Sequence, residues 1–364
     1  MAETVGKRVT MAEVARAAGV SVATVSLVLN GRDRDLQISE TTAIAVLEAA
    51  ARLDYTPNHA ARSLRRRRTN TFTILIFALD NPYYADIARA ARQAAAAHGY
   101  KLHIVETLGP DAEMDALRNL QSGDSDGVIV ATIRHGALPH ASEAFREVVR
   151  RGLAAVTLLD YSADPRIPAI RIDDEADAYL ATAHLITLGH RRIAYLNNST
   201  ATELAQGQPG HAFDRYRGYR RALGDAGIPF DPACVFAGHW SPAGGRAMVR
   251  ELLARAEPRP TALFCFNDLI AIGALRGLYE AGVRVPGEMA VLGFDGIEPG
   301  AFTTPALSTV AHSREDLGRL GVETLLGLLD GRAPDKPDHV LPGRLLLRES
   351  CGTPSAFRLG GGAP

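Results

Sequence analysis

The side chains best suited to ligand chemistry stand where the apolar segments of the sequence end. Carboxylates and amides at such points can pair with hydroxyl groups, and an aromatic ring can cover an apolar ring surface. The side chains of both kinds are Asp80, Asn81, Asp160, Asn197, Asn198, Trp240, Asn267, Asp268 and Asp295. Any one of them is better explained as an ordinary polar loop residue. Most of them together indicate a binding cleft.

The apolar segments predict buried strands that alternate with helices. A continuous apolar run from Phe72 to Leu79 is followed by a helix pattern from Tyr83 to Ala97. Further strands are predicted at 101–106, 127–131, 154–159, 192–197, 235–238, 262–266 and 289–293. Near-continuous apolar strands separated by helices are typical of parallel sheets covered on both faces. We therefore expect two doubly wound lobes that bind ligands outside the carboxyl ends of their strands.

The N-terminal residues follow a different pattern, that of a helix-turn-helix. Thr10 and Glu13 have the spacing of a capping box, Gly19 ends the first helix, and Ser21 is placed to cap the second. The outward face of the second helix consists of Val22, Ala23, Thr24, Ser26, Leu27 and Asn30. A helix in this position enters the major groove of DNA. A small helical cap on an enzyme would have the same spacing, so the pattern alone leaves that alternative open.

A third helix and a short helical piece follow the helix-turn-helix. Ser39 is placed to cap the third helix, whose predicted core side consists of Ile44, Leu47, Ala50, Ala51 and Leu53. Pro57 breaks the pattern and suits the first turn of a new helix over Asn58–Arg65. Because so short a helix is marginal in water, we expect it to become ordered only against a partner.

Charge and composition agree with a small DNA-binding head on a larger body. Residues 1–68 hold eleven Lys or Arg against seven Asp or Glu, a net charge of +4, whereas the remainder has a net charge of −5. The three cysteines are far apart and match no metal or disulfide spacing. No apolar run approaches the length of a membrane span, and the N-terminus has no segment of signal-peptide type, so a cytoplasmic protein is expected.

The head and the body together resemble the lactose-repressor/galactose-repressor (LacI/GalR) family of bacterial transcription factors. The motifs in the head are Val9-Thr-Met-Ala-Glu-Val-Ala15, Ala18-Gly-Val-Ser-Val-Ala-Thr-Val-Ser26, Val28-Leu-Asn-Gly31 and Leu53-Asp-Tyr-Thr-Pro-Asn-His-Ala-Ala-Arg-Ser-Leu64. Those in the body are Asn81-Pro-Tyr-Tyr-Ala85, Asp126-Gly-Val-Ile129, Leu188-Gly-His-Arg-Arg-Ile193, Arg217-Gly-Tyr-Arg-Arg-Ala222, Phe266-Asn-Asp268 and Val291-Leu-Gly-Phe-Asp295. Each motif is weak alone, but this succession, which covers nearly the whole chain, is highly specific.

The resemblance implies a homodimer that binds a pseudo-palindromic operator. The second helix would read the major groove, and Asn58–Arg65 would form a hinge in the central minor groove, where Leu64 wedges between base pairs and Ala61 lets two hinges approach. The residues expected to contact DNA are Thr10, Ser21, Val22, Ala23, Thr24, Ser26, Leu27, Asn30, Asn58, Ala61 and Leu64. Leu27 departs from the family, which mostly has a basic or polar residue there, so we expect the base pair beneath it to be read by contact with a methyl group or hardly at all.

The resemblance also implies an effector site between the two lobes. Its residues would be Tyr83, Tyr84, Asp160, Arg215, Trp240, Asn267, Asp295 and His312. This set suits a sugar-like polyol, although a nucleobase would use the same aromatic rings. The set contains no lysine, which argues against an effector rich in phosphate. Effector binding would shift the two lobes and so control the ordering of the hinge on DNA.

The implied domain organisation has five parts. These are a helix-turn-helix domain at 1–56, a hinge and linker at 57–69, an N-terminal lobe at 70–171 with 313–341, a C-terminal lobe at 172–312 with 342–356, and a disordered tail at 357–364.

Two other classes of protein fit the sequence less well. An enzyme on an α/β body would need a catalytic centre, but the sequence has no GxSxG elbow, P-loop, GxGxxG after the first strand or metal-ligand cluster. We therefore predict no catalytic residue, no metal site and no cofactor. A transport-type sugar-binding protein would need an export signal and no DNA-binding head, and this sequence shows the opposite.

Overall fold

The computed structural model describes residues 9–29, 38–55, 68–120, 125–132, 147–148, 150–159, 166–207, 210–255, 258–332 and 337–352. The chain divides into two compact units, residues 1–69 and 70–364, which we call the head and the body. Several predicted features lie outside the described residues: Asn30, Asn58, Ala61, Leu64, Asp160 and the tail at 357–364.

The head is built from three short helices, α1 (Met11–Ala18), α2 (Val22–Leu29) and α3 (Glu40–Arg52). Thr10 and Glu13 form the predicted capping box, and Gly19 ends α1 in the left-handed conformation at φ 66°. The Thr24 amide donates to Ser21 Oγ at 3.0 Å, as expected for an N-cap of α2. These local bonds fix the tight turn of a helix-turn-helix.

The core of the head is made of small aliphatic side chains from all three helices. Val14, Val25 and Val46 are fully buried there, beside Val28 and Ala49. Val28 is buried on the C-terminal half of α2, and Leu29 is half-buried against the same core.

The predicted core side of α3 was largely wrong. Ile44 and Leu47 are 48% and 52% exposed, and Ala51 is exposed as well. Ala50 is buried and Leu53 packs against the core, as predicted, but Val46 and Ala49 are buried in place of the other three.

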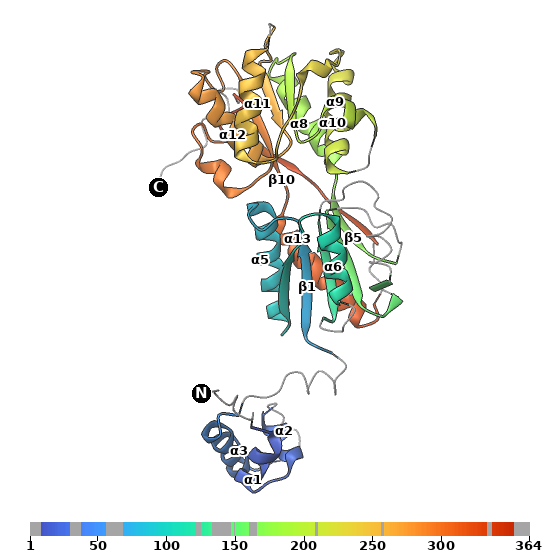
Figure 1. The fold of residues 1–364 in the computed structure, drawn as a ribbon, viewed down its shortest axis with the longest axis vertical. Coiled ribbons are helices and arrows are strands. Elements are labelled where there is room, and N and C mark those ends of the chain that lie inside the picture. The colour runs from blue at the N-terminus through green and yellow to red at the C-terminus, as the bar shows by residue number, and fades with distance from the viewer. Residues whose placement is uncertain are drawn as a thin grey trace, which may run out of the picture. The chain divides into compact units, whose positions relative to one another are not determined.

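The N-terminal lobe of the body contains a six-stranded parallel sheet of order β11-β5-β4-β3-β1-β2 in the part of the chain that is described. Its strands are β1 (Thr71–Ile76), β2 (Lys101–Glu106), β3 (Gly127–Ala131), β4 (Ala154–Leu159), β5 (Ala169–Ile172) and β11 (Asp338–Leu341). Helices α5 (Pro82–Ala97) and α13 (Arg314–Leu329) pack together against one core of this lobe, and α6 (Pro110–Leu120) places Leu117 in the core on the other face (Figure 1).

The C-terminal lobe contains the second described six-stranded sheet, of order β12-β10-β9-β8-β6-β7. Its strands are β6 (Ile193–Asn197), β7 (Val235–Ala237), β8 (Ala262–Cys265), β9 (Ala290–Asp295), β10 (Ser308–Ala311) and β12 (Arg344–Leu346), of which only β12 runs antiparallel. Its helices are α8 (Asp174–Thr187), α9 (Ala201–Ala205), α10 (His211–Asp225), α11 (Pro242–Ala254) and α12 (Asp268–Glu280), and two 3-10 turns cover Pro232–Cys234 and Glu298–Phe302. Helix α8 packs on α10, and α11 packs on α12.

The chain passes between the two sheets at three places: from β5 to α8, from β10 to α13 and from β11 to β12 (Figure 1). The predicted alternation of strands and helices therefore gives two doubly wound lobes, as expected. The sequence pattern did not reveal β5, β10, β11 and β12, which surround these crossings, because each contains a polar or charged residue and so has no continuous apolar run.

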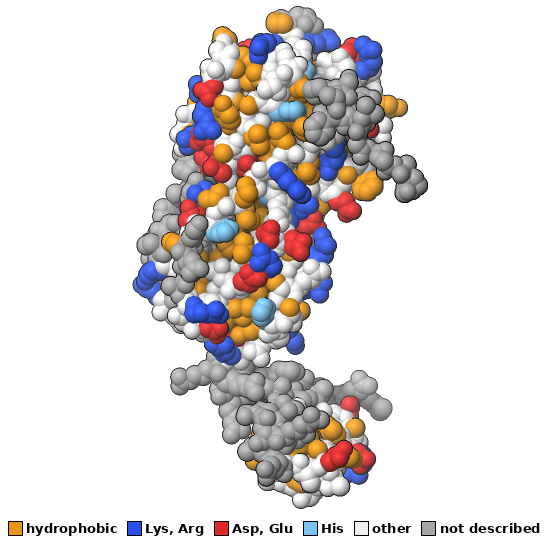
Figure 2. All heavy atoms as spheres, turned by 180° about the vertical axis from the view of Figure 1, so that it is seen from behind, with side chains coloured by type: hydrophobic (Ala, Val, Ile, Leu, Met, Phe, Trp, Pro, Cys, Tyr) orange, Lys and Arg blue, Asp and Glu red, His pale blue; other side chains and the backbone are white. Residues whose placement is uncertain are grey.

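Charges on the body are mixed. On the face seen in Figure 2, Lys and Arg side chains are interspersed with Asp and Glu. Helix α13 provides an example, because Arg319 lies 2.7 Å from Asp316 and 2.8 Å from Glu323. Mixed charges of this kind favour solubility over phosphate binding.

No single helix among the described residues is long and apolar enough to cross a membrane. Helices α1 and α2 taken together are long and apolar enough, but the chain bends by 102° between them.

Candidate effector pocket and DNA-reading helix

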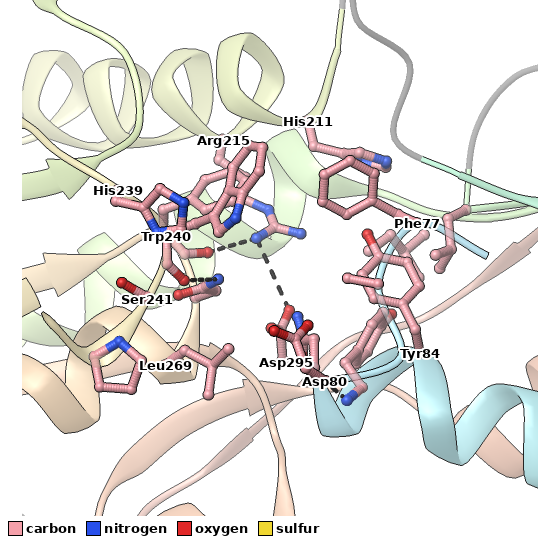
Figure 3. Close-up of a pocket in the computed structure, with 18 residues that line it drawn as sticks. Phe77, Asp80, Tyr84, His211, Arg215, His239, Trp240, Ser241, Leu269 and Asp295 are labelled. Atoms are coloured by element: carbon pink, nitrogen blue, oxygen red, sulfur yellow. Dashed lines mark hydrogen bonds and ion pairs between the residues drawn. The ribbon is translucent and has the colours of Figure 1, made fainter. Parts of the chain in front are cut away.

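A pocket of about 280 Å³ lies between the two lobes of the body, at the carboxyl ends of the strands (Figure 3). Its described lining from the N-terminal lobe is Phe77, Ala78, Asp80, Asn81, Tyr83, Tyr84, Leu159 and Ile172. Its described lining from the C-terminal lobe is His211, Arg215, His239, Trp240, Ser241, Pro242, Phe266, Asn267, Leu269 and Asp295. Both predicted lobes therefore contribute to one site.

The wall from the N-terminal lobe is mainly aromatic and is positioned by the start of α5. Asn81 caps this helix by accepting a hydrogen bond from the Tyr83 amide at 3.0 Å, which turns the two tyrosines toward the core. The rings of Tyr83 and Tyr84 meet edge to face at 5.6 Å, and Tyr84 lies 6.1 Å from Phe77. The Tyr83 hydroxyl is buried without a hydrogen-bond partner among the described residues. Burial raises the pKa of both tyrosines well above the usual value, so both stay protonated.

The wall from the C-terminal lobe contains a buried ionic network centred on Arg215. Arg215 Nε donates to Asp174 Oδ1 at 2.6 Å, and His211 Nδ1 lies 2.6 Å from the other oxygen of the same carboxylate. All three residues are at most 9% exposed. Burial alone would raise the pKa of Asp174, but Arg215 and His211 outweigh it and hold that pKa well below its usual range.

Close packing of α10 on α8 brings this network together. Gly218, one turn after Arg215, touches α8 so closely that a Cβ atom there would overlap the Glu175 carbonyl. The two helices consequently place Asp174, the first residue of α8, against His211 and Arg215 of α10.

The guanidinium group of Arg215 has further contacts that hold it in place. Arg215 Nη1 donates to the Phe266 carbonyl at 2.5 Å, and the guanidinium lies over the rings of Phe294 and Phe266 at 3.7 and 4.5 Å. These cation–π contacts and the bond to Asp174 occupy much of its surface. Although burial lowers the pKa of Arg215, Asp174 and Asp295 raise it more, so the group remains charged.

Asp295, the last residue of β9, extends the network into the pocket. Its Oδ1 lies 3.9 Å from Arg215 Nη1, which is too far for a hydrogen bond, and its backbone φ is 117°. Burial raises the pKa of this carboxyl to about 8, and Arg215 opposes the rise. Its backbone carbonyl accepts from Arg314 Nη1 at 2.8 Å, and Arg314 Nε donates to Asp86 on α5 at 3.0 Å. Arg314 therefore ties this end of the pocket to the helix that forms the opposite wall.

Asn267 and Trp240 complete the C-terminal wall. Asn267 caps α12 by accepting from the Ile270 amide at 2.8 Å, and its amide nitrogen donates to the Trp240 carbonyl at 3.3 Å. The Trp240 ring meets Phe77 of the other lobe edge to face, with 5.1 Å between ring centroids. Figure 3 shows Trp240 and His239 facing Phe77 and Tyr84 across the cavity. Since Trp240 is the single tryptophan of the chain, its fluorescence reports directly on the pocket.

Six of the eight predicted effector residues line this pocket: Tyr83, Tyr84, Arg215, Trp240, Asn267 and Asp295. Asp160 lies outside the described residues. His312 follows β10 at a crossing between the sheets, as predicted, but it is not among the described residues that line the pocket. Its Nε2 lies 2.7 Å from Asp177 on α8, and this pairing directs the ring into the protein interior.

Three polar residues from the ends of predicted strands also lie outside the described lining. Asn197 is fully buried, and its side-chain amide has no hydrogen-bond partner in the described parts of the chain. Asp268 is held by the Thr309 hydroxyl at 2.6 Å and by the Ile297 amide at 2.9 Å. Asn198, which follows Asn197 in the sequence, is half-buried.

Several important residues of the site were missed. Phe77 belongs to the apolar run of the first strand, and His211 and His239 lie in segments without a distinctive motif. Asp174 was missed because an acidic residue at a helix start is common, where it complements the helix dipole. The sequence did signal a further role for these residues, because four acidic side chains are more than a helix start needs. They are Asp173, Asp174, Glu175 and Asp177.

The head presents the predicted reading face on α2. Ser21, Val22 and Ala23 are exposed, and Val22 is 47% exposed. Thr24, Ser26 and Leu27 are half-buried, so their outer atoms remain available to a DNA groove. Thr10 is exposed at the start of α1, where its hydroxyl and amide bond Glu13.

Comparison with known proteins agrees with a helix-turn-helix head on a two-lobed ligand-binding body. The family model "Bacterial regulatory proteins, lacI family" matches residues 10–58, and the model "Periplasmic binding protein-like domain" matches residues 182–351. The chain is 31% identical to the ribose operon repressor of Haemophilus influenzae over 345 residues, which cover 94% of this chain and 98% of that protein. The chain belongs to the lacI family of bacterial regulatory proteins.

Solved structures of relatives have the same architecture. The Lac repressor dimer bound to operator and the anti-inducer ONPF matches with a TM-score of 0.81 and 27% identity, over 95% of this chain and 99% of that one. A LacI family transcriptional regulator from Enterococcus faecium with bound ribose matches with a TM-score of 0.66 and 27% identity, over 77% of this chain and 98% of that one. These matches confirm the predicted family and fold class.

Proposed function

We propose that this protein is a repressor whose affinity for operator DNA is controlled by a small sugar-like effector bound between the two lobes of the body. The observation that carries the proposal is the pocket itself, which joins an aromatic wall from one lobe to a polar wall from the other in a chain of this family. In this proposal Tyr83, Tyr84, Arg215, Trp240, Asn267 and Asp295 contact the effector, and Asp160 lies near it.

The size and chemistry of the pocket favour one uncharged ring. A volume of about 280 Å³ is at the lower end of the range for small-molecule sites. Trp240, Phe77 and Tyr84 offer ring faces, while the Asp295 carboxyl and the unpartnered Tyr83 hydroxyl can bond hydroxyl groups. A monosaccharide combines these features, and the solved relative that holds ribose supports this class. A nucleobase is the second candidate, because flat aromatic surfaces suit it equally.

DNA recognition is assigned to the head and the hinge. We propose that two copies of the chain place Val22, Ala23, Thr24, Ser26 and Leu27 of each α2 in successive major grooves, with Thr10 and Ser21 near the phosphates. Asn30 would extend this contact, and Asn58, Ala61 and Leu64 would contact the central minor groove. The related Lac repressor dimer, solved on its operator, supports this arrangement. A regulator of this kind works in the cytoplasm, where bacterial DNA lies, and needs no catalytic group, metal or cofactor.

The coupling between pocket and DNA is proposed to run through the N-terminal lobe. The division into lobes at 70–171 with 313–341 and at 172–312 with 342–356 places α5 on one side of the cleft and β9 on the other. Arg314 links Asp86 of α5 to the Asp295 carbonyl, so a ligand that displaces Asp295 also pulls on α5. A change in lobe position would then alter how two hinges meet on DNA.

The Trp240→Ala variant tests the assignment of the pocket. A thermal-shift screen of monosaccharides and nucleobases first identifies a ligand for the wild-type protein. We expect Trp240→Ala to weaken binding of this ligand by at least tenfold, measured by calorimetry, because it removes the ring that covers one face. Trp240→Ala should retain operator binding. Removal of residues 1–68 should abolish operator binding and leave ligand binding intact. Unchanged ligand affinity in Trp240→Ala would remove this residue from the site.

A further inference from the structure

The pocket contains an arginine whose positive charge is already neutralised. Arg215 is the one Lys or Arg among the described residues that line the pocket, and it is 5% exposed. Arginine in a ligand site usually binds carboxylate or phosphate through its planar guanidinium. Here Nε of the guanidinium bonds Asp174, Nη1 bonds the Phe266 carbonyl, and the rings of Phe266 and Phe294 lie against the group.

The charges around Arg215 leave no excess of positive charge for an anionic ligand. Asp174 lies 2.6 Å away with a hydrogen bond, and Asp295 lies 3.9 Å away without one. Two carboxyl groups therefore lie beside one guanidinium. His211 is itself 2.6 Å from Asp174 and so faces that carboxylate.

We propose that Asp174 is a specificity-determining residue that makes the pocket reject anionic effectors by neutralising Arg215. This inference rests on the proposed function, since it concerns the ligand of the same pocket. Asp174 does not line the cavity among the described residues, so it acts through Arg215 and not by touching the ligand. Sugar phosphates, sugar acids and nucleotides are thereby excluded, and the effector is an uncharged ring.

Asp174 offsets the charge of Arg215 more strongly than Asp295 does, because it lies closer to the guanidinium. A charge at hydrogen-bond distance offsets the field of Arg215 more strongly than one at 3.9 Å. Asp295 also faces the cavity, where a ligand can bond it, and burial favours its neutral form by raising its pKa to about 8. The pKa of Asp174 is lowered, so its negative charge is permanent at neutral pH.

The variant Asp174→Asn tests the proposal, because an amide has nearly the same shape but no charge. Sodium sulfate is titrated against sodium chloride at equal ionic strength, with Trp240 fluorescence as the signal. A second pair of probes is D-galacturonate and D-galactose, which differ by one carboxylate. We expect sulfate and galacturonate to bind Asp174→Asn at least about tenfold more tightly than the wild type, because a negative charge beside the site has been removed.

Two matched variants separate this effect from general damage. Asp177→Asn removes the other buried carboxylate of α8, which pairs with His312 and not with Arg215, and should gain no anion binding. Asp295→Asn should gain less than Asp174→Asn. If Asp174→Asn does not fold, Asp174→Ser, which leaves space beside Arg215, is titrated in the same way.

The proposal is overturned if the wild type binds sulfate as tightly as Asp174→Asn, or if the neutral variants at position 174 gain no anion binding. Failure of the proposed function would look different. In that case Asp174→Asn would gain anion binding, but no pocket ligand would change the affinity of the wild-type protein for operator DNA.

Discussion

The two walls of the pocket differ in how completely their polar groups are paired. In the wall from the C-terminal lobe, Arg215 and Asn267 are fixed by hydrogen bonds within the protein. In the wall from the N-terminal lobe, the Tyr83 hydroxyl is buried without a described partner, and the remaining surface is mainly aromatic. The C-terminal wall therefore holds Arg215 and Asn267 in fixed positions, whereas the N-terminal wall contains a buried hydroxyl that no described residue pairs.

The largest effect on stability is expected from removing Arg215. Arg215→Ala leaves the buried Asp174 without its main partner, and we expect the free energy of unfolding to fall by about 3–5 kcal/mol, measured by urea denaturation. The control Arg217→Ala removes an arginine on the same helix that is 52% exposed and pairs with Glu175. It should cost less than about 1 kcal/mol. Equal losses in the two variants would contradict a special role for the buried network.

A smaller effect on the free energy of unfolding is expected from a change of pH. Burial raises the pKa of Asp295 to about 8 and that of Asp268 to about 7, whereas both groups in the unfolded chain titrate near their ordinary value of about 4. Between these values the folded protein holds protons that the unfolded chain has released. The free energy of unfolding should therefore fall as pH rises from about 4 to about 8. Asp174, whose pKa is lowered, is ionised in both states over this window and adds no slope.

The variant Asp295→Asn measures the share of this slope that belongs to the pocket. We expect the wild type to lose about 4 kcal/mol between about pH 6 and about pH 8, and Asp295→Asn to lose only about 1 kcal/mol, since only Asp268 still titrates. Urea denaturation at both pH values provides the comparison. An identical slope in the two proteins would mean that Asp295 is ionised in the folded state.

The smallest effect is expected from the unpaired hydroxyl of the aromatic wall. Tyr83→Phe removes a buried group that has no described partner, so we expect the unfolding free energy to stay level or to rise by about 1 kcal/mol. The control Tyr219→Phe removes a hydroxyl that donates to the Ile193 carbonyl at 2.8 Å and should lower stability by about 1 kcal/mol. Thermal unfolding of both variants tests the difference in sign. A loss in Tyr83→Phe as large as in Tyr219→Phe would show that both hydroxyls are paired.

Much of the fold followed from patterns that depend on nearby residues. The capping box at Thr10 and Glu13, the turn at Gly19 and the alternation of apolar strands with helices are set by local chemistry. Six pocket residues were also predicted, because the carboxyl ends of parallel strands converge at one edge and the family resemblance selected among them. The short strands at the crossings were missed, since polar or charged residues interrupt their apolar runs.

The errors and omissions have a common physical origin in long-range pairing. His312 was placed at the site because of its position at a crossing, but Asp177, 135 residues away, bonds its ring. Asp174 was missed although Arg215 was predicted, because only the close approach of α8 and α10 at Gly218 shows that the two are partners. In α3, Ile44, Leu47 and Ala51 were expected in the core, but the helix turns Val46 and Ala49 toward α1 and α2.

The most direct test of the regulatory claim is the effect of a pocket ligand on operator affinity. The full-length protein selects its operator from random-sequence DNA, and fluorescence anisotropy then measures the dissociation constant with and without a saturating ligand from the thermal-shift screen. We predict a change of about 5- to 150-fold in the wild-type protein, the usual size of allosteric coupling. In Trp240→Ala the same change should require at least about tenfold more ligand, because this variant binds the ligand more weakly. A ligand that alters Trp240 fluorescence but leaves operator affinity unchanged would contradict the account.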